Sequence, residues 1–205
     1  MDTPIAKPTK GLERLVMWPL TADEGTSAPS YGEAHEFIKR LMTATDNPSI
    51  AEGSVDADNQ TVEEAVERSG GDLDIGVTAL TAEEEALLYG STLKDGTNVS
   101  NINDIGTYVA AAYMTNRSDG KVNLYKYPKV RFSPQSQSHS TKKKGSVEFA
   151  TIQIKGKYIP LVYNGDVCYE RKAVDPVKDA EIINKWFTDG SYYGANEAEA
   201  STAEG

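Results

Sequence analysis

Two pairs of turn-forming residues, each between runs of alternating polar and apolar residues, constrain the fold of this chain. Asp119-Gly120 lies within AAAYMTNRSDGKVNLYKY (110–127), and Asn164-Gly165 lies within YIPLVYNGDVCYER (158–171). Both dipeptides favour a type I′ turn, because both central residues of that turn take positive φ angles. The alternation is typical of half-buried strands. The sequence therefore predicts a mainly β fold with two antiparallel hairpins and short helices.

The first hairpin, 110–127, is apolar on both faces. A two-residue turn places Met114 opposite Tyr125 and Thr115 opposite Leu124. A sheet face that is exposed to water is normally more polar than this. We therefore expect both faces to be covered, either by a helix or by another subunit.

The second hairpin is expected to bring Leu161 opposite Cys168 across its turn. Pro160 has no N–H group to donate to a neighbouring strand, so its strand is expected at an edge or at a bulge. A further strand is expected just before this hairpin, over 147–154.

The segment from Gly71 to Gly90 changes its period halfway. Residues 72–78 alternate as a strand does, and a short helix is expected over 81–89. Thr81 and Glu84 have the spacing of a capping box, and Gly90 favours the left-handed conformation that ends a helix.

A second helix is expected between Asp175 and Gly190. Asp175 is suited to the N-cap, Pro176 to the first turn and Gly190 to the end of the helix. The apolar residues recur at helical spacing. The predicted buried face consists of Val177, Ala180, Ile183 and Phe187, with Ile182 and Trp186 beside it.

The N-terminal third of the chain is harder to assign. A strand is expected over 12–18 and a loop over 21–32, whereas 34–42 fits either a strand or a helix. The segment 43–60 is long and polar, contains Pro48 and Gly53, and is expected to be an extended or mobile loop.

Length and composition indicate one domain with two terminal extensions. The chain has 205 residues. We expect an arm over 1–10, a β domain over 11–193 with the long loop at about 43–60, and a disordered acidic tail over 194–205. The net charge of −10 argues against a nucleic-acid-binding protein with a basic face. A lone cysteine and the lack of a long apolar run predict folding in a reducing cytoplasm, without a signal peptide or membrane span.

No group of residues in the sequence indicates catalysis. His35 and His139 are far apart in the chain and are expected at the surface or an interface, and Cys168 is expected to be a small buried hydrophobe. No nucleophile elbow, phosphate-binding loop or dinucleotide fingerprint is present. We therefore expect no enzyme activity, no catalytic residue and no cofactor.

One segment partly matches a calcium-binding loop. Asp56, Asp58 and Glu67 occupy positions 1, 3 and 12 of the loop pattern, but Thr61 stands where the sharp turn needs glycine. We therefore expect no metal site.

A cluster of three lysines stands out in this acidic chain. Lys142, Lys143 and Lys144 fit either the solvated tip of a loop or a contact with an acidic surface of another copy. Glu63-Glu64 and 83–85 would supply such a surface.

Four segments, in this order, resemble the major tail proteins of long-tailed, siphovirus-type phages, in particular those common in phages and prophages of Gram-positive bacteria. The resemblance covers about 11–193 and has no single diagnostic motif. The segments are VDADNQTVEEAVERSGGDLDIGVTALTAEEEALLYG, DGTNVSNINDIGTYVAAAYMTNRSDGKVNLYKYPKVRFS, KGSVEFATIQIKG and EIINKWFTDG.

The resemblance implies a tail tube subunit with a β-sandwich-like or barrel-like fold. In this family six subunits form a ring, and stacked rings form the channel for DNA ejection. The partners would be further copies of the chain, a tape-measure protein in the lumen, and tail-tip and tail-terminator proteins. The protein would be assembled in the host cytoplasm and located in the virion tail. DNA would pass without sequence-specific binding, through a lumen expected to be acidic.

The resemblance also implies roles for particular segments. The segment 43–60 would be the ring-to-ring loop. The strand 72–78 would belong to a sheet that contributes to the tube wall, and the helix over 81–89 would pack against the sandwich. The residues expected to contact neighbouring subunits are Met114, Tyr125, Lys142, Lys143 and Lys144. The alternative function is a monomeric β-sandwich binding or adhesion module, which would expose an aromatic platform.

Overall fold

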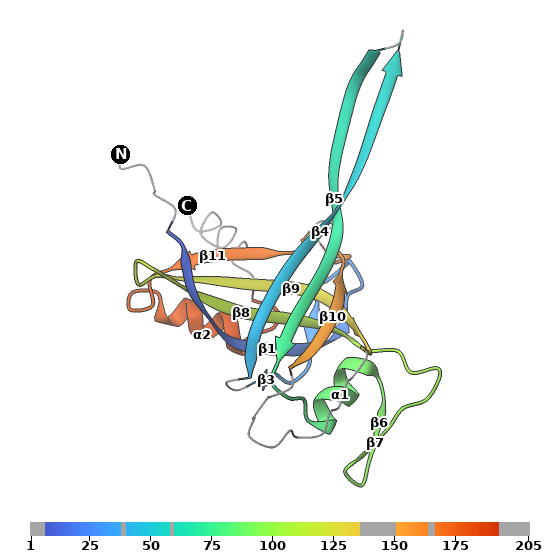
Figure 1. Ribbon diagram of the computed structural model, residues 1–205, viewed down its shortest axis with the longest axis vertical. Coiled ribbons are helices and arrows are strands. Elements are labelled where there is room, and N and C mark those ends of the chain that lie inside the picture. Colours follow the sequence, from blue (N-terminus) through green and yellow to red (C-terminus); the bar gives the residue numbers. More distant parts are fainter. Residues whose placement is uncertain (1–6, 38–39, 58–59, 136–150, 164–166, 193–205) are drawn as a thin grey trace, which may run out of the picture.

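A computed structural model of the chain describes residues 7–37, 40–57, 60–135, 151–163 and 167–192, with the backbone alone at 51–57 and 60–67. In these ranges nine strands form one large sheet, two more form a small one, and there are two short helices (Figure 1). The mainly β fold with short helices is thus confirmed. No helix within the described ranges is long and apolar enough to cross a membrane.

The large sheet is antiparallel throughout its described pairs and has the order β2-β1-β8-β9-β10-β5-β4, with β3 beside β1 and β11 beside β9. Its strands are β1 (Thr9–Ala22), β2 (Ser30–Tyr31), β3 (His35–Phe37), β4 (Leu41–Ala57), β5 (Gln60–Val77), β8 (Tyr108–Arg117), β9 (Val122–Ser133), β10 (Ile152–Tyr158) and β11 (Glu170–Val174). The small sheet pairs β6 (Thr92–Lys94) with β7 (Thr97–Val99), and the helices are α1 (Ala82–Tyr89) and α2 (Ala180–Thr188).

The large sheet folds over on itself around one apolar core. Leu15 of β1 and Tyr113 of β8 lie in the same buried cluster as Ile75 of β5 and Ile154 of β10, although β9 separates these two pairs of strands in the sheet order. Figure 1 shows β4, β5 and β10 running steeply across β8 and β9. The core therefore lies between a layer of β1, β8 and β9 and a layer of β10, β5 and β4.

A second apolar cluster lies on the other face of the β1-β8-β9 layer, beneath α2. Trp18 of β1 and Ala112 of β8 pack there with Trp186 and Phe187 of α2. Both faces of β8 and β9 are thus covered within one chain. A helix, one of the two covers expected from the sequence, lies on one face, whereas the other face is covered by the second layer of the same sheet and not by another subunit.

The β8-β9 hairpin differs by one residue from the predicted register. Met114 pairs with Leu124, and Tyr113 pairs with Tyr125. The Arg117 N–H donates to the carbonyl of Lys121 across a three-residue loop, in which only Gly120 takes a positive φ, of 82°. The predicted type I′ turn is therefore wrong. Since a one-residue shift moves a strand's side chains to the opposite face, Met114 and Tyr125 lie on different faces of the sheet.

The second predicted hairpin is wrong as a pair of adjacent strands. β10 pairs with β5 and β9, and β11 pairs with β9. The turn residues 164–166 lie outside the described residues, and the Leu161 N–H donates to the Val167 carbonyl at 3.2 Å. Cys168 is buried as expected, but it lies between strands rather than on one.

The largest correction concerns the loop expected over 43–60. Residues 41–57 form β4, which pairs along its length with β5. A proline interrupts a strand only where a neighbouring strand needs its missing N–H group. Because β4 lies at the end of the sheet order, one side of the strand has no neighbour, and Pro48 is tolerated there. The segment 34–42, which was open between helix and strand, contains β3 and the start of β4.

Three other predicted elements match in part. β1 includes the expected strand 12–18 but begins at Thr9, within the expected arm. The expected strand 147–154 overlaps β10 only from Ile152, and 147–150 lie outside the described residues. β2 lies within the expected loop 21–32.

Helix α1 confirms the capping-box prediction. The Glu84 N–H donates to Thr81 Oγ1 at 3.3 Å, the Thr81 N–H donates to Glu84 Oε2 at 2.7 Å, and Gly90 ends the helix with a φ of 76°. Glu84 is buried and also forms an ion pair with Arg40, whose Nη1 lies 2.7 Å from Glu84 Oε2. The cap thereby ties α1 to the residue just before β4.

Helix α2 begins later than predicted. The Asp175 carboxylate accepts hydrogen bonds from the N–H groups of Val177 and Lys178, which closes a separate turn before the helix. Asp179 is the N-cap, and the helix ends at Thr188, just before the predicted Gly190. Val177 is 86% exposed and Ala180 is exposed as well, so their predicted place on the buried face is wrong, whereas Phe187 and the neighbouring Trp186 are buried as expected.

Lys126 is a fully buried cation beside the end of α2. Its Nζ donates to the carbonyls of Asp189 at 2.7 Å and Tyr192 at 3.0 Å, and it lies 4.9 Å from the ring centre of Trp18. Burial lowers the pKa of Lys126 to about 8, while the charges of Asp189 and Glu170 act to raise it. The ammonium holds the residues after α2 against β9.

We predict that Glu84→Gln lowers the free energy of unfolding by about 2 kcal/mol, because the half-buried guanidinium of Arg40 loses its charged partner and a buried carboxylate is removed from the capping box. The measurement is urea denaturation at neutral pH. Glu83→Gln is the matched control: its exposed carboxylate lies in the same helical turn, and its loss is expected to cost less than about 0.5 kcal/mol. Equal losses in the two variants would contradict the structural role of Glu84.

We also predict that stability rises between pH 8 and pH 10 by about 2 to 3 kcal/mol because of Lys126. Its pKa is about 8 when folded and 10.5 in the unfolded reference, so the unfolded chain binds more protons in this window. Above pH 10 the trend reverses, because burial raises the pKa of Tyr113 to about 12 and unfolded tyrosines ionise first. Denaturation across this range is expected to show the rise in the parent and not in Lys126→Met. The same dependence of stability on pH in both proteins would refute the role of Lys126.

Candidate assembly surfaces

The outer halves of β4 and β5 form an arm that leaves the rest of the protein (Figure 1). β5 pairs with β10 only over 71–77. Beyond that point, 49–57 of β4 and 60–70 of β5 pair with each other and with no other described strand. At about 3.3 Å per residue, the β4 side of this arm extends over about 30 Å.

Three side chains fix the base of the arm. Arg68 Nη2 lies 3.1 Å from Asp46 Oδ2, and the Tyr158 hydroxyl donates to Asp46 Oδ1 at 2.7 Å. Arg68 also donates to the Tyr158 hydroxyl. Burial raises the pKa of Tyr158 to about 12, so its hydroxyl keeps the proton that it donates. This triad joins both strands of the arm to β10.

The backbone bends where the arm begins. The β4-β5 register shifts between Ser49 and Ile50, opposite Gly70 and Arg68, so that β5 has one extra residue there. Gly70 has a φ of 138°, and a Cβ at this position would overlap the Tyr158 carbonyl oxygen. Only glycine fits such a close approach in that conformation. The direction of the arm is therefore fixed by the backbone as well as by the triad.

The outer side of β4 is an open sheet edge along the arm, whereas the start of β4 lies close to β1 and β3. Among the described strands β4 pairs only with β5, whereas the outer side of β1, near the other end of the sheet, is partly paired with β2 and β3. An open edge has unpaired N–H and C=O groups that pair readily with a strand of another chain.

The outer face of the β10-β5-β4 layer is polar, and we call it the polar face. It consists of three rows across the strands, because paired residues share a face. Lys157 is paired with Asp72, with 4.0 Å between Nζ and Oδ1, and Lys155 is paired with Asp74. The rows are Thr43–Gly76–Gln153, Thr45–Asp74–Lys155 and Asn47–Asp72–Lys157.

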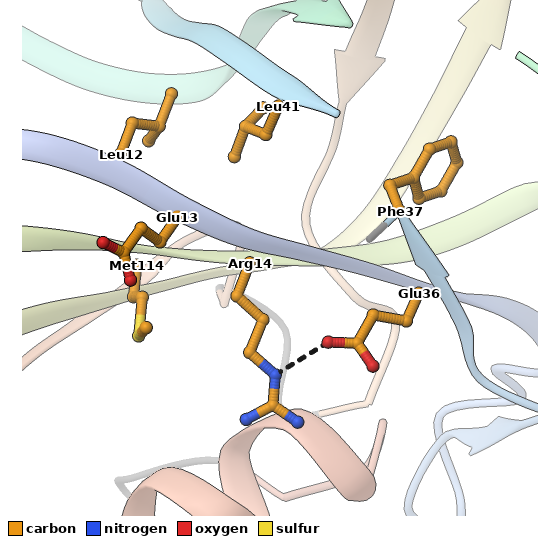
Figure 2. A pocket seen from close by; sticks show the side chains of 7 residues that line it. All are labelled: Leu12, Glu13, Arg14, Glu36, Phe37, Leu41 and Met114. Carbon is orange, nitrogen blue, oxygen red and sulfur yellow. Dashed lines mark hydrogen bonds and ion pairs between the residues drawn. The ribbon is translucent and has the colours of Figure 1, made fainter. Parts of the chain in front are cut away.

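A groove with an apolar floor lies at the seam between β1, β3 and the start of β4 (Figure 2). Its volume is about 650 Å³. Arg14 takes a positive φ of 54° at a bulge of β1, its Nε donates to Glu36 Oε1 at 3.1 Å, and its guanidinium lies over the ring of Phe187. Because Arg14 and Glu36 neutralise each other, the groove presents mainly apolar side chains, as surfaces that contact another protein do. The lining residues are Leu12, Glu13, Arg14, Glu36, Phe37, Leu41 and Met114.

An exposed apolar surface lies on the segment after α1, at the opposite end of the molecule from the tip of the arm (Figure 1). Ile102 is 99% exposed and Ile105 is 69% exposed. Asn98 Nδ2 donates to Glu85 Oε2 at 3.1 Å, which ties β7 to α1. Leu93 and Val99 of the small sheet are also exposed.

The structure does not bring the predicted contact residues together. Met114 lines the groove, whereas Tyr125 faces the core side and stacks on Tyr113 with 4.8 Å between ring centres. Lys142, Lys143 and Lys144 lie outside the described residues, as does His139. His35 is partly exposed on β3.

The base of the arm was missed by sequence reasoning. Asp46 and Arg68 are 22 residues apart, and Tyr158 is 90 residues further along. No local pattern links them. Of the segment that resembles a calcium loop, 56–57 end β4 and 60–67 lie in β5, whereas Asp58 lies outside the described residues. Among the described residues, no three His, Cys, Asp or Glu side chains gather where they would hold a metal ion.

Comparison with protein-family models gives no match, and comparison with curated protein sequences gives none either.

We predict that Arg68→Ala loosens the arm and leaves the body of the protein folded. The variant removes an ion pair and a hydrogen bond at the base, which together contribute about 1 to 2 kcal/mol. Hydrogen exchange is expected to speed up for the amides of 49–57 and to stay unchanged in β8 and β9. Arg171→Ala is the matched control, because Arg171 lies over Tyr125 and away from the arm. Faster exchange throughout the variant, or unchanged exchange in the arm, would contradict the anchoring role of Arg68.

Proposed function

We propose that this protein is a major tail tube subunit of a siphovirus-type phage, which assembles into stacked rings around a channel for DNA. The observation that carries the proposal is the arm. A two-stranded hairpin is marginally stable in water by itself, so an arm of this length is expected to be stabilised by another molecule. A neighbouring copy in the next ring is the partner that the sequence resemblance implies.

The open edge of β4 supports the same proposal. A contact that uses different surfaces on its two partners closes into a ring when its rotation allows. In this chain the edge of β4 along the arm, 49–57, and the groove at the seam of β1, β3 and the start of β4 are two such different surfaces. The number of six subunits in a ring comes from the family resemblance.

The partners follow from the proposed role. They are further copies of this chain, a tape-measure protein in the lumen, and tail-tip and tail-terminator proteins. The location is the tail of the virion, after assembly in the host cytoplasm. The role is structural and requires no catalytic residue and no cofactor.

Two observations disfavour the alternative of a monomeric binding or adhesion module. Such modules present aromatic rings on an exposed platform, whereas both tryptophans, Trp18 and Trp186, are at most 1% exposed. Tyr113, Tyr127 and Tyr158 are buried in the core.

We predict that the concentrated protein forms rings or tubes with a central channel, visible by negative-stain electron microscopy. A variant in which 50–68 are replaced by an Asn-Gly turn is the control. It keeps the described layers and the β10 pairing of 71–77, so it is expected to remain folded and to lose stacked tubes.

Virions provide a second test of the same proposal, which applies even if the free protein stays monomeric until a tail-tip complex nucleates its assembly. Gold-labelled antibodies against this chain are expected along the tail tube. Label on the capsid, or only on the tip, would show that the proposal is wrong.

A further inference from the structure

We propose that residues 189–192 form a lid over the second apolar cluster, which opens as a local unit and closes more firmly when Lys126 loses its proton. We call these residues the C-terminal lid. The inference does not depend on the tube function, because it concerns contacts within one chain. Three observations support it: the lid lies directly on buried aromatic rings, one buried ammonium holds its carbonyl groups, and its residues belong to neither a helix nor a strand.

The first observation is the close approach of the lid backbone to two aromatic side chains. Gly190 is buried, and a Cβ atom at this position would lie 2.9 Å from Tyr31 Cβ and 3.1 Å from Trp18 Cγ. The ring of Tyr192 lies edge-on to that of Trp186, with 6.3 Å between the ring centres. Both tryptophans are at most 1% exposed while the lid is closed. Opening of the lid would therefore expose indole rings to water.

The second observation is that one ammonium group holds several carbonyl groups of the lid. Lys126 Nζ donates to the carbonyl of Asp189 at 2.7 Å and to that of Tyr192 at 3.0 Å. The carbonyl oxygen of Gly190 lies 3.5 Å from the same atom. Lys126 is fully buried in this arrangement. When the lid opens, these contacts are lost and the ammonium is hydrated.

The third observation is that the lid lies outside the regular elements. Residues 189–192 follow the end of α2, and the described sheet pairs do not include them. The lid folds around Asp189, whose carboxylate accepts hydrogen bonds from the N–H and the hydroxyl of Ser191. Segments of this kind open at a lower free energy than the strands of a core. The opening is therefore expected to be local, with β8 and β9 still paired.

Lys126 links the closing of the lid to pH. Burial lowers the pKa of Lys126 to about 8, whereas the charges of Asp189 and Glu170 act to raise it. In the open state the hydrated ammonium regains its ordinary pKa of 10.5. Between pH 8 and pH 10 the closed state therefore binds fewer protons than the open state. Closing is favoured as the pH rises through this range.

The charged groups around Lys126 come from three parts of the fold. Glu170 of β11 is its register partner, Asp189 belongs to the lid, and Lys185 of α2 lies over the ring of a lid residue. The neighbours of Lys126 on β1 and β8 are an indole ring and Ala112, which are both uncharged. Lys185 thus offers a control for the removal of positive charge near the lid.

Hydrogen exchange of the lid amides tests this inference. In the full chain, exchange of the Ser191 and Tyr192 amides is measured by NMR at pH 7 and pH 9, and each rate is compared with the intrinsic rate at that pH. Protection is expected to be lower than in β8 and to rise about tenfold between the two pH values, as pKa values of about 8 and 10.5 require. Protection that does not rise with pH, or that equals the protection of β8, would overturn the inference.

Two charge variants separate the effect of Lys126 from that of a nearby exposed lysine. Lys126→Met is expected to abolish the rise in protection, and Lys126→Gln replaces it if the methionine variant fails to fold. Lys185→Met removes an exposed charge beside the lid and is expected to keep the tenfold rise. A rise that persists without Lys126, or that disappears without Lys185, would overturn the role of the buried ammonium.

A third variant tests the contact between the lid and the rings without a change of charge. The added methyl group of Gly190→Ala would push the lid away from Tyr31 and Trp18. Protection of the Ser191 and Tyr192 amides is expected to fall several-fold at both pH values, while the rise with pH and the protection of β8 are kept. Unchanged protection of the lid in this variant would show that residues 189–192 do not close over the rings.

Discussion

The position of the arm depends on β5, because of the two strands of the arm this one also pairs with β10 in the described sheet. Its inner half, 71–77, lies between β10 and β4 and buries Leu73, Ile75 and Val77 in the core. Its outer half pairs only with β4 among the described strands. The free energy gained by burying three large aliphatic side chains therefore fixes the base of an arm that buries much less itself. Any load on the arm would be transmitted through β5 to the core.

Elements with local signals were predictable from the sequence. Thr81, Glu84 and Gly90 act within one short helix, so the capping box and the end of α1 could be predicted from spacing alone. The β8-β9 turn shows the limit of such signals. Asp119-Gly120 correctly indicated a hairpin, but Gly120 is also suited to the left-handed position of a three-residue loop, and that choice shifted the register by one residue.

The arm and its base required contacts that no local pattern contains. Pro48 and Gly53 suggested a loop, whereas pairing with β5 makes the segment a strand. Asp46, Arg68 and Tyr158 meet only because the sheet brings three distant segments together. The burial of Lys126 was not predictable either. Its neighbours on β9 show only the alternation of a strand, and its hydrogen-bond partners are backbone carbonyls after α2. Backbone partners have no sequence signature.

The acidic residues of the described chain are unevenly distributed between the arm and the polar face. Residues 49–57 and 60–70 of the arm include five acidic residues (Glu52, Asp56, Glu63, Glu64 and Glu67) and one basic residue, Arg68. The polar face has two of each sign. If the acidic excess of the chain lined the wall, it would repel DNA and add an electrostatic barrier along the whole tube. Paired charges exert little net force on a polyanion, and part of the acidic excess of the chain lies on the arm, away from the three rows.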